Sequence, residues 1–279
     1  MHYKRKVLCT GDPMLDLYLT DREELKSFNG GALNVYQNFL ALTEYHYDKI
    51  NPIFAYPNSG QFLKGDIYNC YTIFRDYRYP GIDFRLSSTK EKDIFYESGN
   101  VQAEIIFHEP EVLIIGDYNK GTVNNDSFDP DQKLPNVKYA IVDSRYRSLD
   151  LNWLSSSETK IWHATKDEYD SDWASNFDFV FWTNASQPVK VLRNNKLIGT
   201  VSVPETKVVN SCGCGDTFTA TIAAYISLYD YSSDQDMIEY AKSAVEVCQD
   251  VLTKPFTATT TKRINEKCIL QTSKRQFMS

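Results

Sequence analysis

Four short apolar runs in the middle of the chain constrain its fold more than any other feature. They occupy residues 111–117, 139–142, 160–163 and 177–182, and polar residues follow or end each of them. Intervals of helical length separate the runs. Continuous apolar runs of strand length are typical of strands buried on both faces of a parallel sheet that helices cover. The sequence therefore predicts an α/β fold in which the polar strand ends gather along one edge of the sheet.

Other segments fit the same plan. Strands are expected at residues 6–10, 14–19 and 53–56, and a hairpin at 189–192 and 196–201. Helices are expected at about 32–42, about 61–77, from 216 onward, and at about 234–252. Residues 89–105 alternate in character around the turn signal Ser-Gly-Asn at 98–100, which predicts a second hairpin with one polar face.

Composition narrows the class of protein. The 279 residues are 42% hydrophobic, enough for the core of one large α/β domain or of two small ones, and no repeat or linker marks a boundary. A net charge of −7 argues against a nucleic-acid partner. No apolar run approaches the length of a signal peptide or a membrane span, so we expect a cytoplasmic protein without a membrane partner. Its six scattered cysteines are then expected to be free thiols.

The stretch 208–218 carries the most chemistry. Gly213 and Gly215 flank Cys214, Asp216 follows, and apolar residues then recur at helical spacing. Backbone N–H groups at a helix N-terminus lack intrahelical partners, and glycine lets a ligand approach them closely, so such a turn suits a phosphate or a developing oxyanion. A carboxylate would oppose anion binding there, so we expect Asp216 to accept a proton from a hydroxyl. This combination suggests a phosphotransferase acting on an alcohol; alternatively, Asp216 is only the N-cap of the helix.

Two further groups of residues suggest a site for a polar ligand. Asp12 and Asp16 stand near the carboxyl end of the first strand, where polyol hydroxyls could bind. The alternatives are turn chemistry for Asp12 and a solvated face for Asp16. Gly30 and Gly31 precede a helix and permit close approach of a ligand, toward which Asn34 could donate and accept hydrogen bonds.

Together, these motifs resemble the ribokinase-like (PfkB) carbohydrate kinases, and most closely the heptose-7-phosphate kinase branch. The similar segments are 11–16, 30–35, 89–92 with 99–102, 116–121 and 210–218, and they follow the family order over about residues 6–260. The resemblance implies a three-layer αβα sandwich with a mostly parallel central sheet. It also implies one domain over residues 1–279, a small β lid from about 17–29 and 84–108, and possible pairing of two subunits through that lid as a homodimer.

The resemblance also implies roles for individual residues. Asp216 would be the catalytic base, and the N–H groups of Gly213, Cys214 and Gly215 would form the anion hole for the γ-phosphoryl group of ATP. The sugar or sugar phosphate would be held by Asp12, Asp16, Gly30, Gly31, Asn34 and Lys120. ATP would lie near Thr183, Lys254 and Thr257, and Glu168 would help place Mg²⁺ through water.

Several residues depart from the family pattern, mostly on the nucleotide side. Thr165 stands where the family has asparagine, Ala185 and Phe256 where it has glycine, Lys242 where it often has asparagine, and Cys212 where it has threonine. These departures leave a second hypothesis open, namely a catalytically lapsed kinase fold that binds a sugar or a partner protein. A kinase for a nucleoside or a small vitamin is a third hypothesis, which fits the opening motif at 11–16 less well.

Overall fold

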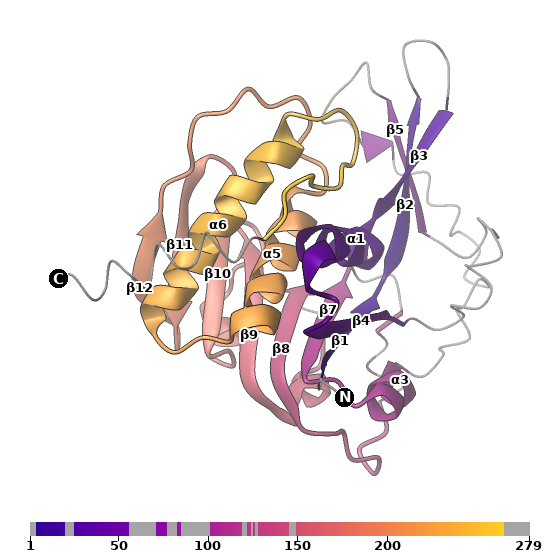
Figure 1. Ribbon diagram of the computed structural model, residues 1–279, viewed down its shortest axis with the longest axis vertical. Coiled ribbons are helices and arrows are strands. Elements are labelled where there is room, and N and C mark those ends of the chain that lie inside the picture. Colours follow the sequence, from indigo (N-terminus) through magenta and orange to yellow (C-terminus); the bar gives the residue numbers. More distant parts are fainter. Residues whose placement is uncertain are drawn as a thin grey trace.

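An eight-stranded sheet runs through the centre of the computed structural model (Figure 1). The structure describes residues 4–19, 25–55, 71–76, 83–84, 101–118, 122–123, 125, 128–144 and 149–264. The strands are β1 (Arg5–Gly11), β4 (Ile50–Phe54), β7 (Val112–Asp117), β8 (Val137–Ser144), β9 (Ser157–Thr165), β10 (Phe179–Asn184), β11 (Gln187–Arg193) and β12 (Lys196–Val201). Their order is β12-β11-β10-β9-β8-β7-β1-β4. Pairing is parallel from β4 to β10 and antiparallel between β10, β11 and β12, so the predicted mostly parallel sheet is confirmed.

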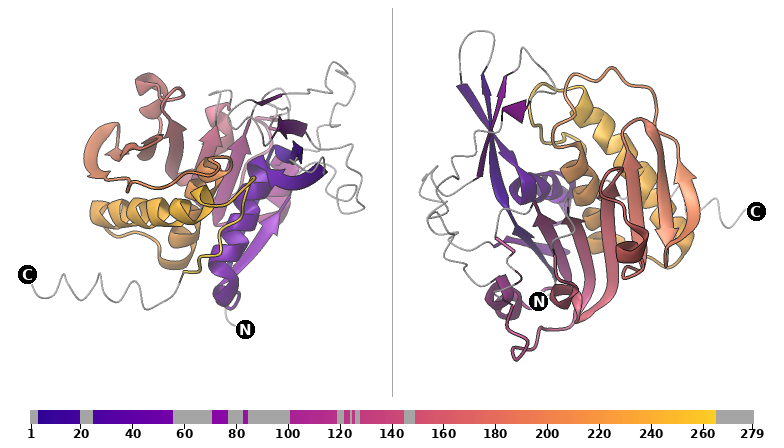
Figure 2. Two further views of the ribbon diagram at one scale, coloured as in Figure 1. Left: turned by 90° about the horizontal axis from the view of Figure 1, so that it is seen from above. Right: turned by 180° about the vertical axis from the view of Figure 1, so that it is seen from behind.

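Helices cover both faces of this sheet. The helices α1 (Gly31–Thr43), α5 (Cys214–Tyr229) and α6 (Asp234–Leu252) pack on one face, as the views in Figure 2 show. The helices α3 (Val101–His108) and α4 (Ser171–Ala174), with the 3-10 turn η4 (Leu151–Leu154), pack on the other. A further 3-10 turn, η1 (Glu44–His46), follows α1. The chain is thus a three-layer αβα sandwich.

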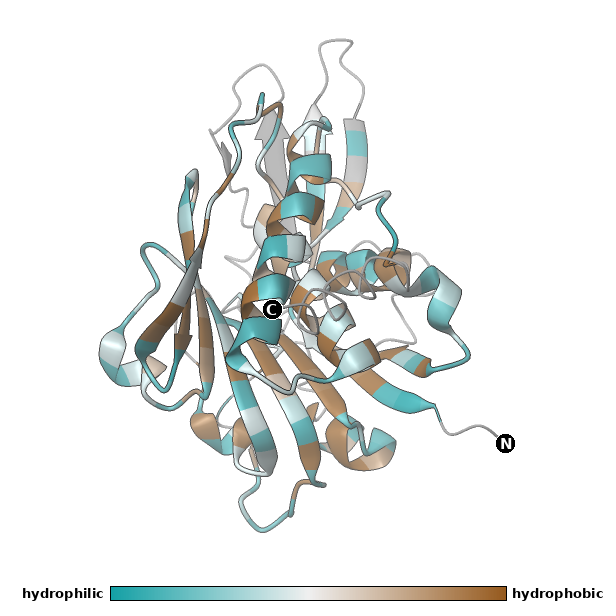
Figure 3. Ribbon diagram, turned by 60° about the vertical axis from the view of Figure 1, so that its left-hand side comes forward, coloured by the Kyte–Doolittle hydropathy of each residue, from teal (hydrophilic) through white to brown (hydrophobic). Residues whose placement is uncertain are grey.

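Alternation along the central strands fills both cores. In β1, Val7 and Cys9 join the core under α1 and α5, whereas Leu8 between them joins the core on the opposite face. Successive strand side chains point to opposite faces, so a strand covered on both sides must be apolar throughout. Figure 3 shows apolar residues concentrated along these strands. The same requirement explains why the apolar runs were visible in the sequence.

A second, four-stranded sheet stands beside one edge of the sandwich (Figure 1). It consists of β2 (Pro13–Leu19), β3 (Leu25–Gly30), β5 (Tyr71–Asp76) and β6 (Asp83–Phe84), in the order β3-β2-β5-β6. The β2–β3 and β5–β6 pairs are antiparallel, and β2–β5 is parallel. Its position and size are consistent with a lid.

Two sequence predictions near this sheet are wrong. Residues 71–76, at the end of the expected helix 61–77, form strand β5, because pairing with β2 outweighs local helix propensity. Residues 101–108, expected in the lid hairpin, form α3, which buries Val101 and Ile105 one helical turn apart against the main sheet. Residues 61–70 and 85–100 of these two predictions lie outside the described residues.

The last described segment, residues 260–264, is attached to α1. The backbone N–H of Thr260 donates to Asn38 Oδ1 at 2.9 Å, and the N–H of Ile264 donates to the Leu42 carbonyl at 3.0 Å. His46 Nε2 lies 2.9 Å from the carbonyl oxygen of Ile264. The last described residues are therefore held against α1 and the 3-10 turn η1 that follows it. Within the described ranges, no helix combines the length and apolar character needed to cross a bilayer.

Candidate active site

The glycine turn lies at the N-terminus of α5, as predicted. Gly213 is the N-cap, with a left-handed φ of 80° that favours glycine. A Cβ atom there would lie 2.5 Å from Asn34 Nδ2 and 3.1 Å from Thr257 Cγ2. A Cβ at Gly215 would lie 3.5 Å from His163 Cε1. The absence of a side chain at Gly213 thus lets α1 and the C-terminal loop approach the turn, whereas a Cβ at Gly215 would make only an ordinary contact with β9.

The three amides expected to form the anion hole differ in their present partners. The N–H of Cys214 donates to the carbonyl of Ser211 at 3.2 Å. The N–H groups of Gly213 and Gly215 donate to no acceptor among the described residues. Two of the three donors are therefore available to an anion, and the third would have to exchange its bond with Ser211.

Asp216 is the third residue of α5, so the alternative that it is the N-cap of this helix is wrong. Its side chain is only 3% exposed. Asn34 Nδ2 donates to its Oδ2 at 2.8 Å, and the Tyr118 hydroxyl donates to its Oδ1 through a short hydrogen bond. Asn38 Nδ2 donates to Asn34 Oδ1 at 3.0 Å, which fixes the Asn34 amide with its nitrogen toward the carboxylate. The carboxylate of Asp216 thus accepts from an amide and a hydroxyl.

The carboxylate of Asp12 bonds to backbone groups of the protein itself. Asp12 is fully buried, and its carboxylate accepts hydrogen bonds from the backbone N–H groups of Tyr118 at 2.8 Å and Thr122 at 3.0 Å. These bonds order the chain after β7. Their donors are 106 and 110 positions away in sequence, so they are not the local turn considered as an alternative, and sugar binding by Asp12 stays a prediction. Asp12 therefore helps to place Tyr118 opposite Asp216.

Asp16 lies on β2 of the lid sheet and is only 3% exposed, so the solvated alternative is wrong. The hydroxyl of Thr257 donates to its Oδ2 through a short hydrogen bond, and Tyr18 Oη lies 2.9 Å from the same hydroxyl. A Cβ at Gly30 would lie 3.2 Å from Asp16 Oδ2, so the glycine leaves room for this carboxylate. Asp16 thereby ties the lid to the C-terminal loop.

Gly31, the second of the two glycines predicted to contact the sugar, is the first residue of α1. It has a left-handed φ of 56°, and a Cβ there would lie 2.6 Å from the Asp12 carbonyl oxygen. Only glycine fits this position without moving the backbone. Lys120 lies outside the described residues.

A cavity of about 650 Å³ opens on the other side of the glycine turn. It lies where β9 and β10 end and α5 begins, and its wall includes His163, Thr165, Thr183, Cys214, Gly215 and Cys248. Apolar residues of β11, α6 and the segment 203–208 form much of the remaining wall. Thr183, predicted to contact the nucleotide, thus lines this cavity.

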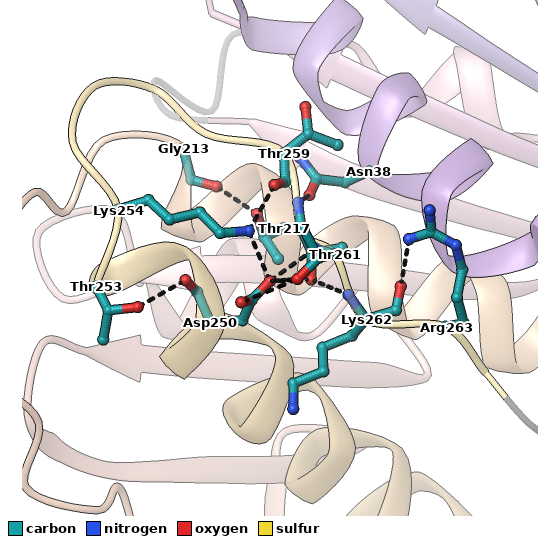
Figure 4. Close-up of polar contacts among 11 residues, drawn as sticks. Asn38, Gly213, Thr217, Asp250, Thr253, Lys254, Thr259, Thr261, Lys262 and Arg263 are labelled. Atoms are coloured by element: carbon teal, nitrogen blue, oxygen red, sulfur yellow. Dashed lines mark hydrogen bonds and ion pairs between the residues drawn. The ribbon is translucent and has the colours of Figure 1, made fainter.

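Lys254 and Thr257, also predicted to contact nucleotide, lie elsewhere. Both line a separate cavity of about 530 Å³ between the lid strands and the C-terminal loop. Lys254 Nζ donates to Asp250 Oδ2 at 2.8 Å and to the Thr259 carbonyl at 3.0 Å, as Figure 4 shows. The structure thus separates these two residues from Thr183.

Asp250 is the centre of the polar contacts in Figure 4. Besides Lys254, it accepts from the hydroxyl of Thr260 at 2.9 Å and from the N–H of Thr261 at 2.7 Å. Burial opposes ionisation of Asp250, but these hydrogen bonds and the charge of Lys254 outweigh it and lower the pKa of the carboxyl to about 2. The ionised carboxylate thus holds the C-terminal loop in its fold.

His163 was missed in the sequence, where its spacing suggested no role. Its buried ring stacks on Phe218, with centroids 4.8 Å apart. Thr219 Oγ1 donates to Asp143 Oδ2 at 3.0 Å and lies 2.9 Å from His163 Nδ1. A hydroxyl has one hydrogen, so Nδ1–H must donate to Thr219. His163 Nε2 then faces Thr183 Oγ1 at 3.1 Å, and a hydrogen-bonded chain leads from Asp143 to the cavity wall.

Tyr118 was the second residue that sequence reasoning missed. Its motif at 116–121 was noticed, but its hydroxyl meets a carboxylate 98 positions away. No spacing rule connects residues so distant in sequence, and the only local signal was their location after a buried strand and beside a glycine turn.

Glu168 follows β9 in the turn toward α4. Its Oε2 accepts from the N–H of Thr165 at 2.9 Å, and Thr165 lines the larger cavity. The described residues contain no group of three or more histidine, cysteine or acidic side chains placed to hold a metal ion. Mg²⁺ commonly uses one or two carboxylates together with water and substrate phosphates, so a single carboxylate beside this cavity fits that ion.

Comparison with known proteins identifies the fold. The sequence matches no protein-family model and no curated protein. Fructokinase from Vibrio cholerae O395, in a form with fructose, ADP and calcium ion bound, has a TM-score of 0.65 at 13% identity, covering 96% of this chain and 98% of that one. Ribokinase from Thermotoga maritima has a TM-score of 0.60 at 12% identity, covering 93% and 97%.

A nucleoside kinase from Methanocaldococcus jannaschii, described as an archaeal member of the ribokinase family, extends the comparison. Its TM-score is 0.59 at 16% identity, and the match covers 98% of this chain and 100% of that one. At such low identities the likeness establishes the fold. The chain therefore has the ribokinase-like αβα architecture.

Proposed function

We propose that this chain is an ATP-dependent kinase that phosphorylates a hydroxyl of a sugar or sugar phosphate. The observation that carries the proposal is the position of Asp216. Its carboxylate already accepts a hydrogen bond from a hydroxyl, that of Tyr118, and it follows directly after Gly215, which lines the larger cavity and whose amide has no acceptor among the described residues. A base for an alcohol and donors for an anion thus lie within one turn of helix.

Phosphoryl transfer would require few further groups from the protein. Phosphoryl transfer depends mainly on alignment and on neutralising charge, so a pair of oriented amides and a fixed carboxylate supply much of what is needed. Asp216 would take the proton of the attacking alcohol as that alcohol becomes acidic. Asn34 would keep the carboxylate oriented, and the lid sheet would exclude water from the acceptor.

The nucleotide would occupy the 650 Å³ cavity. Three observations support this placement: the cavity touches the glycine turn, it lies at the carboxyl ends of parallel strands, and the fructokinase of the same fold has ADP bound. Glu168, with Thr165 beside it, would hold Mg²⁺ through water, and the ion would neutralise phosphate charge when bound. Thr183 would face the nucleotide from the wall.

The opening motif at residues 11–16 favours a heptose-like sugar or its phosphate within this class. A homodimer through the lid sheet belongs to the same proposal. Both points are supported by the resemblance of the motifs.

The test is a panel of sugars and sugar phosphates assayed for ADP release with ATP and Mg²⁺. We expect activity on at least one member, and we expect Asp216→Asn to lower it by about 10²–10⁴-fold, the usual contribution of a general base. The variant should keep its fold, because the asparagine oxygen can still accept from Asn34 and its NH2 group can donate to the Tyr118 hydroxyl oxygen. Substantial activity of Asp216→Asn would show that another group is the base.

One group of observations favours a second function, in which a protein of this kinase fold binds a sugar or a partner protein without phosphoryl transfer. The Cys214 amide is occupied by Ser211, and the carboxylates of Asp16 and Asp216 both hold protein hydroxyls. Calorimetry with ATP, with and without Mg²⁺, separates the two functions. Absence of binding at millimolar ATP would support the second function and contradict the first.

A further inference from the structure

Two cysteine side chains meet beside the glycine turn. Cys214 is the first residue of α5, and Cys248 lies on α6, which packs along α5. Cys248 Sγ donates to the Cys214 carbonyl oxygen at 3.3 Å. Both are free thiols, and both line the 650 Å³ cavity. A small oxidant that enters the cavity therefore reaches two neighbouring thiols.

The two thiols differ in character. The hydrogen bond from Cys248 lowers the pKa of the Cys214 thiol, against the opposing effects of burial and of the Asp216 charge. The same contact, together with burial, raises the pKa of Cys248. Thiolates are the reactive form, so Cys214 is suited to attack and Cys248 to respond. By contrast, burial within β1 raises the pKa of Cys9, which lies away from the cavity.

We propose that Cys214 and Cys248 form a redox modification site that hydroperoxides oxidise to an intramolecular disulfide. The Cys214 thiolate attacks the peroxide oxygen, the O–O bond breaks, and a sulfenic acid forms with release of hydroxide, or of an alkoxide from an organic hydroperoxide. The sulfur of Cys248 then attacks the sulfenic sulfur, its proton leaves with the hydroxyl group, and water is released. Two thiols lose two electrons in total, and the peroxide gains them.

The disulfide would change the anion hole. An S–S bond is about 2.05 Å long with a preferred dihedral angle. The sulfurs of Cys214 and Cys248 are not bonded in the structure, so they must move closer. Cys214 sits between two glycines, and this part of the turn can yield more easily than the interior of α6. The amides of residues 213–215 would shift away from the phosphate position. This last consequence rests on the proposed function, whereas disulfide formation itself does not.

Peptide mapping tests the bond directly. Trypsin cleaves after Lys207 and Lys242, which gives a peptide 208–242 with Cys212 and Cys214. The peptide 243–262 contains Cys248, because the Lys254–Pro255 bond resists trypsin. After treatment with hydrogen peroxide and alkylation of remaining thiols, we expect these peptides to be linked, with the mass of two hydrogen atoms lost. Their absence as a linked pair would overturn the proposal.

Two matched variants identify the partner and the order of attack. Cys212→Ser should still form the linked pair, whereas a link lost in this variant would assign the bond to Cys212 and contradict the proposal. In Cys248→Ser, the sulfenic acid on Cys214 has no resolving thiol, so dimedone should label Cys214. Labelling of wild-type protein should be much weaker, and equal labelling would contradict Cys248 as the resolving thiol.

The functional consequence is measured separately. ATP binding is first determined for reduced protein, then after peroxide and again after dithiothreitol. We expect oxidation to weaken binding by about tenfold or more, with recovery on reduction and no such change in Cys248→Ser. If reduced protein binds no ATP, the proposed kinase function fails, while the linked peptides still decide the redox site. If the linked pair forms and ATP affinity is unchanged, the effect on the anion hole is contradicted.

Discussion

The two sides of the glycine turn are built in opposite ways. On the proposed acceptor side, Asp216 and Asp16 are almost completely buried and both accept hydrogen bonds from protein hydroxyls. On the proposed nucleotide side, the turn opens into a 650 Å³ cavity whose wall is largely apolar. The proposed acceptor side is thus closely packed around two carboxylates, and the proposed nucleotide side is an open cavity.

This difference means that the two ligands would enter their sites in different ways. Buried carboxylates need donors, and the acceptor side supplies them from Tyr118 and Thr257 where a polyol would otherwise donate. An incoming alcohol must therefore replace a hydroxyl rather than enter an empty space. The nucleotide side needs no such exchange, except at the Cys214 amide. Recognition of the acceptor is thus expected to depend on hydrogen bonds and that of the nucleotide mainly on shape.

Among the substitutions that compare the two sides, the largest effect is expected from Gly213→Ala, which would affect both sides at once. The added methyl would lie 2.5 Å from Asn34 Nδ2, at a backbone φ of 80°. We expect activity to fall by about 10²-fold or more, because Asn34 would no longer hold Asp216 in place. Strain should also lower the free energy of unfolding by roughly 1–3 kcal/mol. Steady-state kinetics and urea unfolding measure the two effects.

Gly199→Ala is the matched control for steric crowding. Its Cβ would lie 2.5 Å from the flexible end of Ile238, away from the glycine turn. We expect some loss of stability with kcat unchanged. Equal losses of activity in the two variants would mean that Gly213 has no special role.

The nucleotide side is tested by Thr183→Val, which keeps the shape and removes one hydroxyl. His163 Nε2 would lose its partner at 3.1 Å, and the KM for ATP should rise about tenfold while the KM for the acceptor stays constant. Thr183→Ser restores the hydroxyl and should restore the ATP KM. A rise in the acceptor KM instead would contradict the assignment of this side.

The acceptor side is tested by the corresponding removal of a hydroxyl in Tyr118→Phe. Without Tyr118 as competitor, the acceptor should bind Asp216 more easily, and its KM should fall by about two- to tenfold while the KM for ATP is unchanged. Tyr36→Phe serves as control: it removes the hydroxyl of a ring whose centroid lies 5.2 Å from that of Phe54. A large fall in kcat of Tyr118→Phe would instead make Tyr118 part of the reaction.

The smallest effect on activity is expected from Asp250→Asn, in the last turn of α6, where the carboxylate holds the C-terminal loop. We expect less than about twofold change in kcat but a loss of roughly 1 kcal/mol in unfolding free energy at pH 7. The pKa of Asp250 is lowered from 3.8 to about 2, so its contribution is present above about pH 4 and disappears as the pH falls through about 2. The difference between the variant and wild type should narrow over that range in pH-dependent unfolding. A constant difference would contradict the role of its charge.

The sequence predicted the sandwich well because its strands are covered on both faces. Such strands must be apolar throughout, and α6 appeared at 234–252 as it does in the structure. The lid region was predicted less well. Strand β5 depends on pairing with β2, about 60 residues earlier, and α3 was taken for a strand because its buried Val101 and Ile105 lie in a short segment with weak periodicity.

Within the site, local motifs located the glycine turn and Asp216 but not their surroundings. Asp12 accepts a hydrogen bond from the Tyr118 N–H, and Lys254 donates to Asp250; the sequence indicated neither contact, and the ligand contacts expected of both residues stay predictions. The reason is physical: a charged side chain in a loop looks the same in sequence whether its partner is a ligand or the protein. Lys120, Mg²⁺ binding, the heptose-like substrate and the dimer stay predictions.

The attachment of residues 260–264 to α1 has a consequence for the order in which the protein is made. Asn38 binds both Asn34, which holds Asp216, and Thr260, and Leu42 binds Ile264. During synthesis the ribosome releases α1 long before either partner exists. A nascent chain can therefore form much of its central sheet while the proposed active site is still incomplete. We expect the protein to have no activity until residues 260–264 have been synthesised and have bonded to α1.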